Sequence, residues 1–332
     1  MGKPRLSVSV FQKHGVWELR LATVKVLLHY HAGRRLAAEF AELSTDGISL
    51  SATPEGDEEA LLAKLPETVA LLHVLEPVTA ERMNAAPRLT LIQKLGVGVN
   101  TIDLDAARER GIAVANMPGA NATAVAEMTL GLLLAVLRKI PTLDRTTREG
   151  TGWFRPPDPD QLGEVAGKTV GLVGYGDIAK HFGTIVEAMG ARVIHHRRGP
   201  GPDSLPLDDL LATADIVSIH LPLTDETRDL LNAGRLQEMK RGAILLNTGR
   251  GGIVDEEALA TLLQSGHLGG AGLDVFASEP VATDSPLLTL ENVVVTPHVA
   301  WLTGDTLIRC VRLGVDNCRR MAAGEQIANR IV

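Results

Sequence analysis

The chain has 332 residues, of which 45% are hydrophobic and only 3% aromatic, and its formal net charge is −7. This length suits two domains of ordinary size, each with a core of aliphatic side chains. The acidic balance argues against a nucleic-acid binder or a protein that adheres to anionic membranes, because both usually present a basic surface. We therefore expect neither nucleic acid nor a membrane among its partners.

Two features of the sequence favour a reducing compartment. The N-terminal residues contain no apolar segment of the kind that a signal peptide needs. Cys310 and Cys318 share one helical pattern, which would place them roughly 12 Å apart, whereas a disulfide needs Cα atoms within about 7 Å. We predict free thiols and a cytoplasmic protein.

Strands and helices alternate through the first part of the chain. Residues 1–22 show no clear pattern, and we treat them as an extension that could add an edge strand. The expected strands are 24–29, 47–52, 69–74, 91–94 and 112–115, and the expected helices are 33–43, 58–65, 79–86 and 104–110. This alternation predicts a parallel sheet with helices on both faces.

A long apolar segment, residues 121–140, follows the fifth strand. About 20 apolar residues would suffice for a membrane span, but Asn121, Glu127, Arg138 and Lys139 interrupt the segment, and a buried helix is the better interpretation. Residues 151–167, rich in proline and glycine, predict a loop.

The alternation then starts again and predicts a second doubly wound unit. Its expected strands are 168–173, 193–195, 216–220, 243–247, 271–274 and 293–296, and a last helix covers 305–323.

A glycine-rich turn follows the first strand of this second unit. Gly174, Gly176 and Ala179 fit the G-x-G-x-x-G/A pattern, and the turn opens a helix. Such a turn brings backbone amides and a helix N-terminus close to a pyrophosphate. We predict a dinucleotide site in which the residues at the turn are Gly174, Tyr175, Gly176, Asp177 and Ile178. The alternative is an ordinary glycine turn between a strand and a helix.

The end of the next strand should meet the adenosine ribose, about 20 residues after the turn. An NAD enzyme usually has an acid there, but this chain has Arg197 and Arg198. Because a guanidinium pairs with phosphate, we predict that NADP is preferred over NAD. The alternative is that both arginines are solvated and that the cofactor is NAD; Asp203 could then serve as the acid, although Gly199–Pro202 intervene.

Three polar residues follow three successive strands of the second unit: Arg250, Glu279 and His298. In open α/β sheets, ligands bind outside the carboxyl ends of strands. Arginine offers a permanently charged fork for a carboxylate and a keto oxygen. Histidine titrates near neutrality and can donate a proton, and a neighbouring glutamate would favour its protonated form. The set suits hydride transfer to a 2-oxo acid, and no metal ligands are predicted.

Several motifs together give the chain a family resemblance over residues 24–325. They read LGVGVNTIDLDAARERGIAVANMPGANATAVAE (95–127), VGLVGYGDIA (170–179), HLPLTDETRDLL (220–231), LLNTGRGGIVDEEAL (245–259), GLDVFASEP (272–280) and TPHVAWLT (296–303). With these motifs the chain resembles the D-2-hydroxy-acid dehydrogenase family. Because of Arg197, it is most similar in type to the NADPH-preferring glyoxylate and hydroxypyruvate reductases.

The resemblance implies a role for each site residue. Arg250 would bind and polarise the substrate, His298 would be the acid and base, and Glu279 would be the partner of His298. Beside Arg250 and His298, cofactor contacts would come from His220, Pro222, Thr227, Thr248, Gly249, Asp274 and Ala300, with Asp274 at the nicotinamide carboxamide. Substrate contacts would come from Leu75, Val97 and Gly98, together with Arg250 and His298.

The resemblance also implies an architecture and an activity. A flavodoxin-like substrate domain would comprise residues 1–121 and 301–332, and a Rossmann dinucleotide-binding domain would comprise 122–300. The expected assembly is a homodimer built on the cofactor domain and the helix near 121–140. The expected reaction passes a hydride between NAD(P)H and a 2-oxo acid, giving the D-2-hydroxy acid.

Other proteins of the same fold remain as alternatives. Formate dehydrogenases have Gln beside the histidine, so Glu279 argues against that activity, and phosphite oxidation would need a more basic loop than LGVGVN. A nucleotide-sensing protein that resembles the transcriptional corepressors could retain Arg250, Glu279 and His298, but the acidic composition argues against it.

Overall fold

A computed structural model describes the whole chain except residues 1–8, 14–15, 21–22, 45–46, 155–156 and 200–202. The chain divides into two compact units. Unit 1 comprises Met1–Asn121 and Thr303–Val332, and unit 2 comprises Ala122–Leu302. Each unit contains a parallel sheet with helices on both faces, as the alternating pattern predicts.

The sheet of unit 1 has the strand order β4-β3-β5-β6-β7. Its strands are β3 (Val24–His29), β4 (Ile48–Thr53), β5 (Ala70–His73), β6 (Leu91–Lys94) and β7 (Ala113–Ala115). Its helices are α1 (Arg34–Leu43), α2 (Glu58–Lys64), α3 (Ala80–Asn84), α4 (Leu104–Glu109) and α11 (Gly304–Ala323). Counted along the sheet, this order is 2-1-3-4-5, the flavodoxin-like arrangement.

The two faces of this sheet bury different helices. Leu27, Leu71 and Ile92 pair across β3, β5 and β6 and pack in one core with α2, α3 and α4. On the opposite face, Gly314 of α11 comes so close to the sheet that an added Cβ would lie 2.9 Å from Leu72. The last helix of the chain is therefore part of unit 1.

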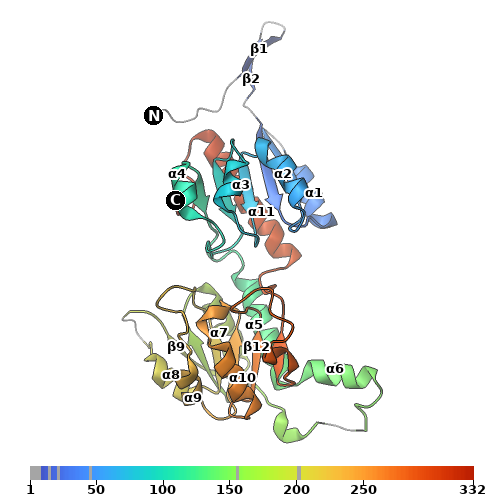
Figure 1. The fold of residues 1–332 in the computed structure, drawn as a ribbon, viewed down its shortest axis with the longest axis vertical. Helices are drawn as coiled ribbons and strands as arrows, with labels where there is room; N and C mark the ends of the chain where they lie inside the picture. The colour runs from blue at the N-terminus through green and yellow to red at the C-terminus, as the bar shows by residue number, and fades with distance from the viewer. Residues whose placement is uncertain (1–8, 14–15, 21–22, 45–46, 155–156, 200–202) are drawn as a thin grey trace. The chain divides into compact units, whose positions relative to one another are not determined.

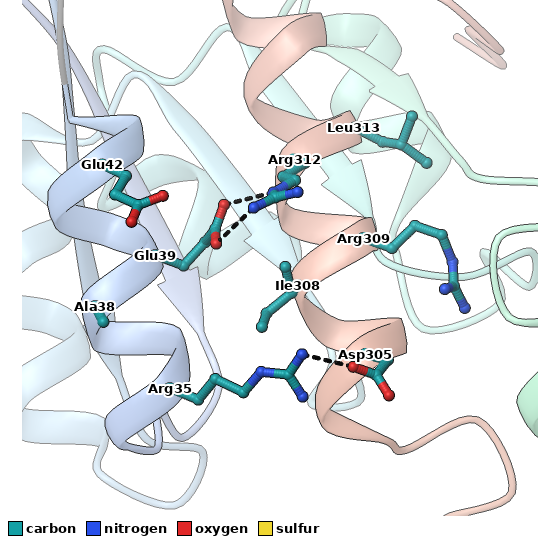
Figure 2. Close-up of a pocket in the computed structure, with 9 residues that line it drawn as sticks. All are labelled: Arg35, Ala38, Glu39, Glu42, Asp305, Ile308, Arg309, Arg312 and Leu313. Atoms are coloured by element: carbon teal, nitrogen blue, oxygen red, sulfur yellow. Dashed lines mark hydrogen bonds and ion pairs between the residues drawn. The ribbon is translucent and has the colours of Figure 1, made fainter.

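Helix α11 also packs against α1, and ion pairs link the two helices (Figure 2). Arg312 holds Glu39 with two hydrogen bonds of 2.5 and 2.9 Å, and Arg35 lies 2.6 Å from Asp305. The bidentate contact lowers the pKa of the Glu39 carboxyl, since its hydrogen bond to the guanidinium outweighs burial. The hollow between the helices, of about 630 Å³, is thus bordered by two ion pairs, together with Glu42 and Arg309.

The sheet of unit 2 has the strand order β13-β12-β11-β10-β8-β9. Its strands are β8 (Thr169–Val173), β9 (Arg192–His196), β10 (Ile216–Ile219), β11 (Ile244–Asn247), β12 (Gly270–Leu273) and β13 (Val293–Val295). Its helices are α5 (Ala122–Leu137), α6 (Ile140–Arg148), α7 (Asp177–Ala188), α8 (Leu207–Thr213), α9 (Ala233–Glu238) and α10 (Glu256–Gln264). Helices α5 and α7 cover one face, and α8, α9 and α10 cover the other.

The order of these strands determines where a ligand can bind. The chain leaves β8 for β9 on one side and returns to β10 on the other side. At such a switch point the connections diverge and leave a crevice outside the carboxyl ends of the strands. In this unit the glycine turn that follows β8 lies at that point.

Of two expectations about the elements, the buried helix within residues 121–140 is confirmed and the edge strand at the N-terminus is wrong. Helix α5 buries eight of its 16 residues and ends at Leu137. Lys139 then adopts a left-handed φ of 49°, and α6 begins at Ile140 with Pro141 in its first turn. Helix α6 buries none of its residues, and Figure 1 shows it projecting from the sheet of unit 2. At the N-terminus, β1 (Ser9–Lys13) and β2 (Val16–Arg20) pair with each other as a separate antiparallel sheet, and neither strand extends the edge of the larger sheet.

In the described part of the chain, every helix is too short or too polar to cross a membrane.

Candidate active site

The glycine turn between β8 and α7 has the geometry that a pyrophosphate site requires. Gly174 has φ +95°, and a Cβ there would lie 2.6 Å from the carbonyl oxygen of His220, so only glycine fits. Gly176 is the N-cap of α7, and the position of its missing Cβ faces open space. Amides at the start of a twelve-residue helix therefore border free volume, which suits an anionic phosphate.

The end of β9 is fixed by contacts on both sides. The ring of His195 stacks on Tyr175 of the glycine turn, with centroids 3.8 Å apart. His196 Nδ1 donates to the carbonyl oxygen of Leu205 at 2.9 Å. The two histidines thus connect the strand to the glycine turn and to the segment after the loop, roles that the sequence pattern did not reveal.

Arg197 and Arg198 continue from this fixed strand end and are exposed. The amide of Arg197 donates to Ser204 Oγ at 3.1 Å. The guanidinium of Arg198 lies 3.8 Å from Glu226, in a pair so exposed that it contributes little to stability. Asp203, the alternative acid, is also exposed and has φ +64°.

The loop after β10 contains three of the expected cofactor residues, His220, Pro222 and Thr227. His220 Nε2 lies 2.9 Å from Ser218 Oγ, and burial lowers the pKa of this imidazole to about 4. Thr227 donates its hydroxyl to the carbonyl oxygen of Pro222 at 2.7 Å and closes the loop. The backbone carbonyl of His220 thus lies against Gly174, and its neutral ring packs near Phe182 of α7, with ring centroids 5.9 Å apart.

The turn after β11 is organised by Asn247, a residue that sequence reasoning missed. Its side-chain amide donates to the carbonyl oxygen of Arg250 at 2.9 Å, and its oxygen accepts from the amide of Gly249 at 3.0 Å. Thr248 is anchored from α5 by Thr129 at 2.9 Å. The buried polar side chain at a strand end was the available signal, since such a group needs partners.

His298 and Glu279 form a hydrogen-bonded pair at the ends of β13 and β12. His298 Nδ1 donates to Glu279 Oε2 at 2.7 Å, while Glu279 Oε1 accepts from the amide of Phe276 at 3.0 Å. Burial raises the pKa of Glu279, but the hydrogen bond from His298 and further contacts outweigh it, so the pKa is lowered. The carboxylate therefore stays ionised beside the ring, and Nε2 is the nitrogen that can exchange a proton with a ligand.

Arg250 lies at the end of β11, next to β12 in the sheet. Burial lowers the pKa of its guanidinium, and the charge of Glu279 opposes that effect. The guanidinium Nη1 donates to the carbonyl oxygen of Gly249 at 2.7 Å. Unit 2 thus presents a cation, a carboxylate and an imidazole at one edge of its sheet.

Asp274 is almost completely buried and holds the turn that contains His298. Its Oδ1 accepts from Thr296 Oγ1 at 2.5 Å and from the amide of Val299 at 2.9 Å, and its Oδ2 accepts from the amide of Ala300 at 2.9 Å. Its backbone oxygen accepts from His298, which has φ +55°. Burial raises the pKa of this carboxyl despite these bonds. The contacts give Asp274 a structural task besides the one expected at the nicotinamide.

In unit 1, the expected substrate residues Leu75, Val97 and Gly98 follow β5 and β6 at one edge of the sheet. Val97 is 46% exposed, and Gly98 is half-buried. Glu55 Oε1 accepts from the amides of Leu75 at 2.7 Å and of Glu76 at 2.8 Å, a contact that no sequence motif signalled. Among the described residues, no group of three or more His, Cys, Asp and Glu side chains could hold a metal ion.

Comparisons with known proteins give a consistent result. Residues 130–300 match the family model of the D-isomer specific 2-hydroxyacid dehydrogenase, NAD binding domain. The chain is 42% identical over 284 residues to a D-3-phosphoglycerate dehydrogenase of Mycobacterium bovis, covering 83% of this chain and 53% of that protein. It therefore spans about half the length of that relative.

Two further relatives match over most of their own length. A glyoxylate reductase of Aeropyrum pernix is 39% identical over 289 residues, covering 82% of this chain and 85% of that protein. A solved NADPH-dependent glyoxylate/hydroxypyruvate reductase from Sinorhizobium meliloti, in complex with NADP and malonate, has a TM-score of 0.79 at 29% identity, covering 94% of this chain and 97% of that chain.

Proposed function

Because the chain belongs to the D-isomer specific 2-hydroxyacid dehydrogenase family, we propose that it reduces a 2-oxo acid to the D-2-hydroxy acid with a nicotinamide cofactor. The observation that carries this proposal is the 2.7 Å hydrogen bond between His298 and Glu279, at the strand end next to that of Arg250. The name of one relative supports it, since the glyoxylate reductase of Aeropyrum pernix matches 82% of the length of this chain.

The proposed roles of the three residues follow from their contacts. Glu279 fixes the ring of His298 through Nδ1, so that Nε2 gives a proton to the keto oxygen during reduction and takes it back during oxidation. Arg250 holds the substrate carboxylate and polarises the keto group with its guanidinium. Unit 1 would be the substrate domain and contribute Leu75, Val97 and Gly98, and unit 2 would be the cofactor domain.

The residues of unit 2 fit a nicotinamide dinucleotide, which supplies or accepts the hydride when bound. The open space at Gly176 and the N-terminus of α7 suit its pyrophosphate. We propose that Gly174–Ile178, His220, Pro222, Thr227, Thr248, Gly249 and Ala300 line the cofactor, with Asp274 near the nicotinamide. The lowered pKa of His220 keeps its ring uncharged at neutral pH, so this residue adds no charge to the proposed cofactor site.

We propose further that NADP is preferred over NAD. Arg197 and Arg198 are exposed at the end of β9, where an acid would otherwise select NAD. The guanidinium groups would pair with the 2′-phosphate. The reductase from Sinorhizobium meliloti, solved with NADP, supports the proposal by analogy.

A homodimer in the cytoplasm is the proposed state of the protein. Helix α6 buries none of its own residues, and the following Trp153 and Phe154 are 81% and 85% exposed, which favours a partner for this projecting part. The two cysteines are free and buried, which suits a reducing compartment.

One experiment tests the function and the cofactor together. Glyoxylate, hydroxypyruvate and larger 2-oxo acids are each assayed with NADPH and with NADH, using wild type and His298→Ala. We expect turnover with NADPH above that with NADH, and a loss of kcat of at least about 100-fold in the variant, with binding of NADPH retained. Equal or better use of NADH would refute the cofactor preference, and normal turnover by His298→Ala would refute the assigned proton donor.

A further inference from the structure

The loop Val74–Pro77 in unit 1, which includes the expected substrate residue Leu75, is held by carboxylates. Glu55 accepts from the amides of both Leu75 and Glu76. Glu76 accepts from the amide of Gly56 at 2.6 Å through Oε1. The two loops are therefore cross-linked: the carboxylate of each glutamate accepts hydrogen bonds from the backbone amides of the other loop.

The cations around this loop already have partners. Arg82 Nη2 donates to Glu58 at 2.5 Å and to Glu76 at 3.0 Å, and its Nη1 donates to the carbonyl oxygen of Pro77 at 2.8 Å. Lys94 donates to the carbonyl oxygen of Val74. The three carboxylates of Glu55, Glu58 and Glu76 thus outnumber the two cations, Arg82 and Lys94, and both cations are already engaged.

An independent feature lies directly under these acids. His29 is 1% exposed, and its Nε2, which lies 3.6 Å from Glu76 Oε2, has no hydrogen-bond partner among the described residues. Burial lowers the pKa of this histidine. His73 and Thr53 flank His29 in the register, and each also has a buried polar atom without a hydrogen bond in the described chain. These three side chains, Thr53, His29 and His73, are neutral at neutral pH and therefore do not offset the negative charge of the carboxylates at the loop.

We propose that Glu76, supported by Glu55, makes this loop select substrates by charge: it accepts a neutral or cationic substituent on the third carbon of the 2-oxo acid and rejects a second anionic group. The inference rests on the proposed function and names its substrate class. A phosphorylated substrate would bring a dianion beside Glu76, where the cations of the described residues, Arg82 and Lys94, already have partners. Like charges repel strongly where solvent is partly excluded.

The inference separates two possibilities that sequence identity leaves open, since relatives at 42% and 39% identity are named for a phosphorylated and an unphosphorylated substrate. Hydroxypyruvate and 3-phosphohydroxypyruvate differ only by the phosphate. A comparison of kcat/KM for this pair, with the full chain and its preferred cofactor, isolates the effect of the added charge.

We expect wild type to favour hydroxypyruvate by about tenfold or more. Glu76→Gln retains an oxygen acceptor for Gly56 and should lower this ratio about threefold or more by improving use of the phosphate ester. Glu81→Gln, an exposed position on α3 with the same loss of net charge, is the matched control and should leave the ratio unchanged. Because salt screens such repulsion, the wild-type ratio should also fall as ionic strength rises.

The outcomes distinguish this inference from the proposed function. If the phosphate ester is reduced as well as hydroxypyruvate or better, the charge selection is wrong and the proposed activity stands. A ratio that is unchanged in Glu76→Gln and insensitive to salt also overturns it. If Glu76→Gln fails to fold, the salt dependence of wild type decides. If neither compound nor any other 2-oxo acid is reduced, both proposals fall.

Discussion

Among the glycines that the structure describes, an added Cβ would meet another segment most closely at Gly251, where it would reach Phe276. A Cβ on Gly251 would be 1.8 Å from the carbonyl carbon of Phe276, and real Cβ atoms are not found nearer than 3.0 Å to such neighbours. Gly251→Ala must therefore separate the two segments by at least the difference, 1.2 Å. Arg250 precedes one segment, and the amide of Phe276 holds Glu279 in the other, so the substitution moves the cation away from the carboxylate.

The magnitude follows from that displacement. A shift of about 1 Å in a catalytic group can cost about 100-fold in rate, and overpacking a tight interior costs about 1–3 kcal/mol. We expect Gly251→Ala to lower kcat/KM about 100-fold and the free energy of unfolding by about 2 kcal/mol or more. Steady-state kinetics with a 2-oxo acid and denaturant unfolding measure the two effects.

The adjacent glycine provides the control. A Cβ on Gly252 would lie 3.3 Å from the end of the flexible Leu223 side chain, which can move aside. Gly252→Ala should therefore keep most of the activity and stability. Near-normal kcat/KM in Gly251→Ala, or equal losses in both variants, would refute the argument from backbone contact.

Two further predictions concern buried polar groups. Asp274→Asn should place a side-chain NH₂ against a backbone N–H that donates to the carboxylate in wild type. The lost hydrogen bond should lower the free energy of unfolding by about 1–3 kcal/mol and should also lower kcat. Unchanged unfolding and turnover would contradict the role of this side chain. Burial depresses the pKa of His220 from 6.5 to about 4 in the folded chain. Between these two pH values the unfolded chain binds a proton that the folded chain does not. The free energy of unfolding therefore decreases as the pH is lowered through this range, by up to about 1.4 kcal/mol per pH unit. Urea unfolding should show a shallower pH dependence in His220→Asn than in wild type, and equal slopes in the two proteins would contradict this reasoning.

The sheets were predictable because their strands are short apolar runs that alternate with helical patterns. Val24–His29 and Leu91–Lys94 have the expected bounds. The pattern could not reveal helix α6, because its residues are mostly polar and none of them is buried, so no apolar stripe marks it in the sequence. Nor could it show whether the N-terminal segment joins a sheet, since that depends on pairing partners and not on local propensity.

The site was predictable at the strand ends, where topology alone brings side chains to one edge. Its supporting contacts were not, because they depend on which atoms meet. Asn247 organises the Arg250 turn through two side-chain hydrogen bonds, and Glu55 holds the Leu75 loop across 20 residues of sequence. Asn247 lies within the motif 245–259, but the motif does not show which side chain holds the turn, and Glu55 lies outside the motifs that carry the family resemblance.

The proposed preference for NADP and the proposed rejection of a phosphorylated substrate both depend on charged side chains just after a strand. On the cofactor side, β9 is fixed by the stacking of His195 on Tyr175, so Arg197 and Arg198 can change the preferred nucleotide without altering the sheet. On the substrate side, Glu76 belongs to a loop whose backbone Glu55 already holds. Both proposals have the fold fix the strand end and leave the choice of ligand to a few charges just beyond it. Relatives with the same fold and different substrates are therefore expected, and charge-changing substitutions at these loops should alter preference with little effect on stability.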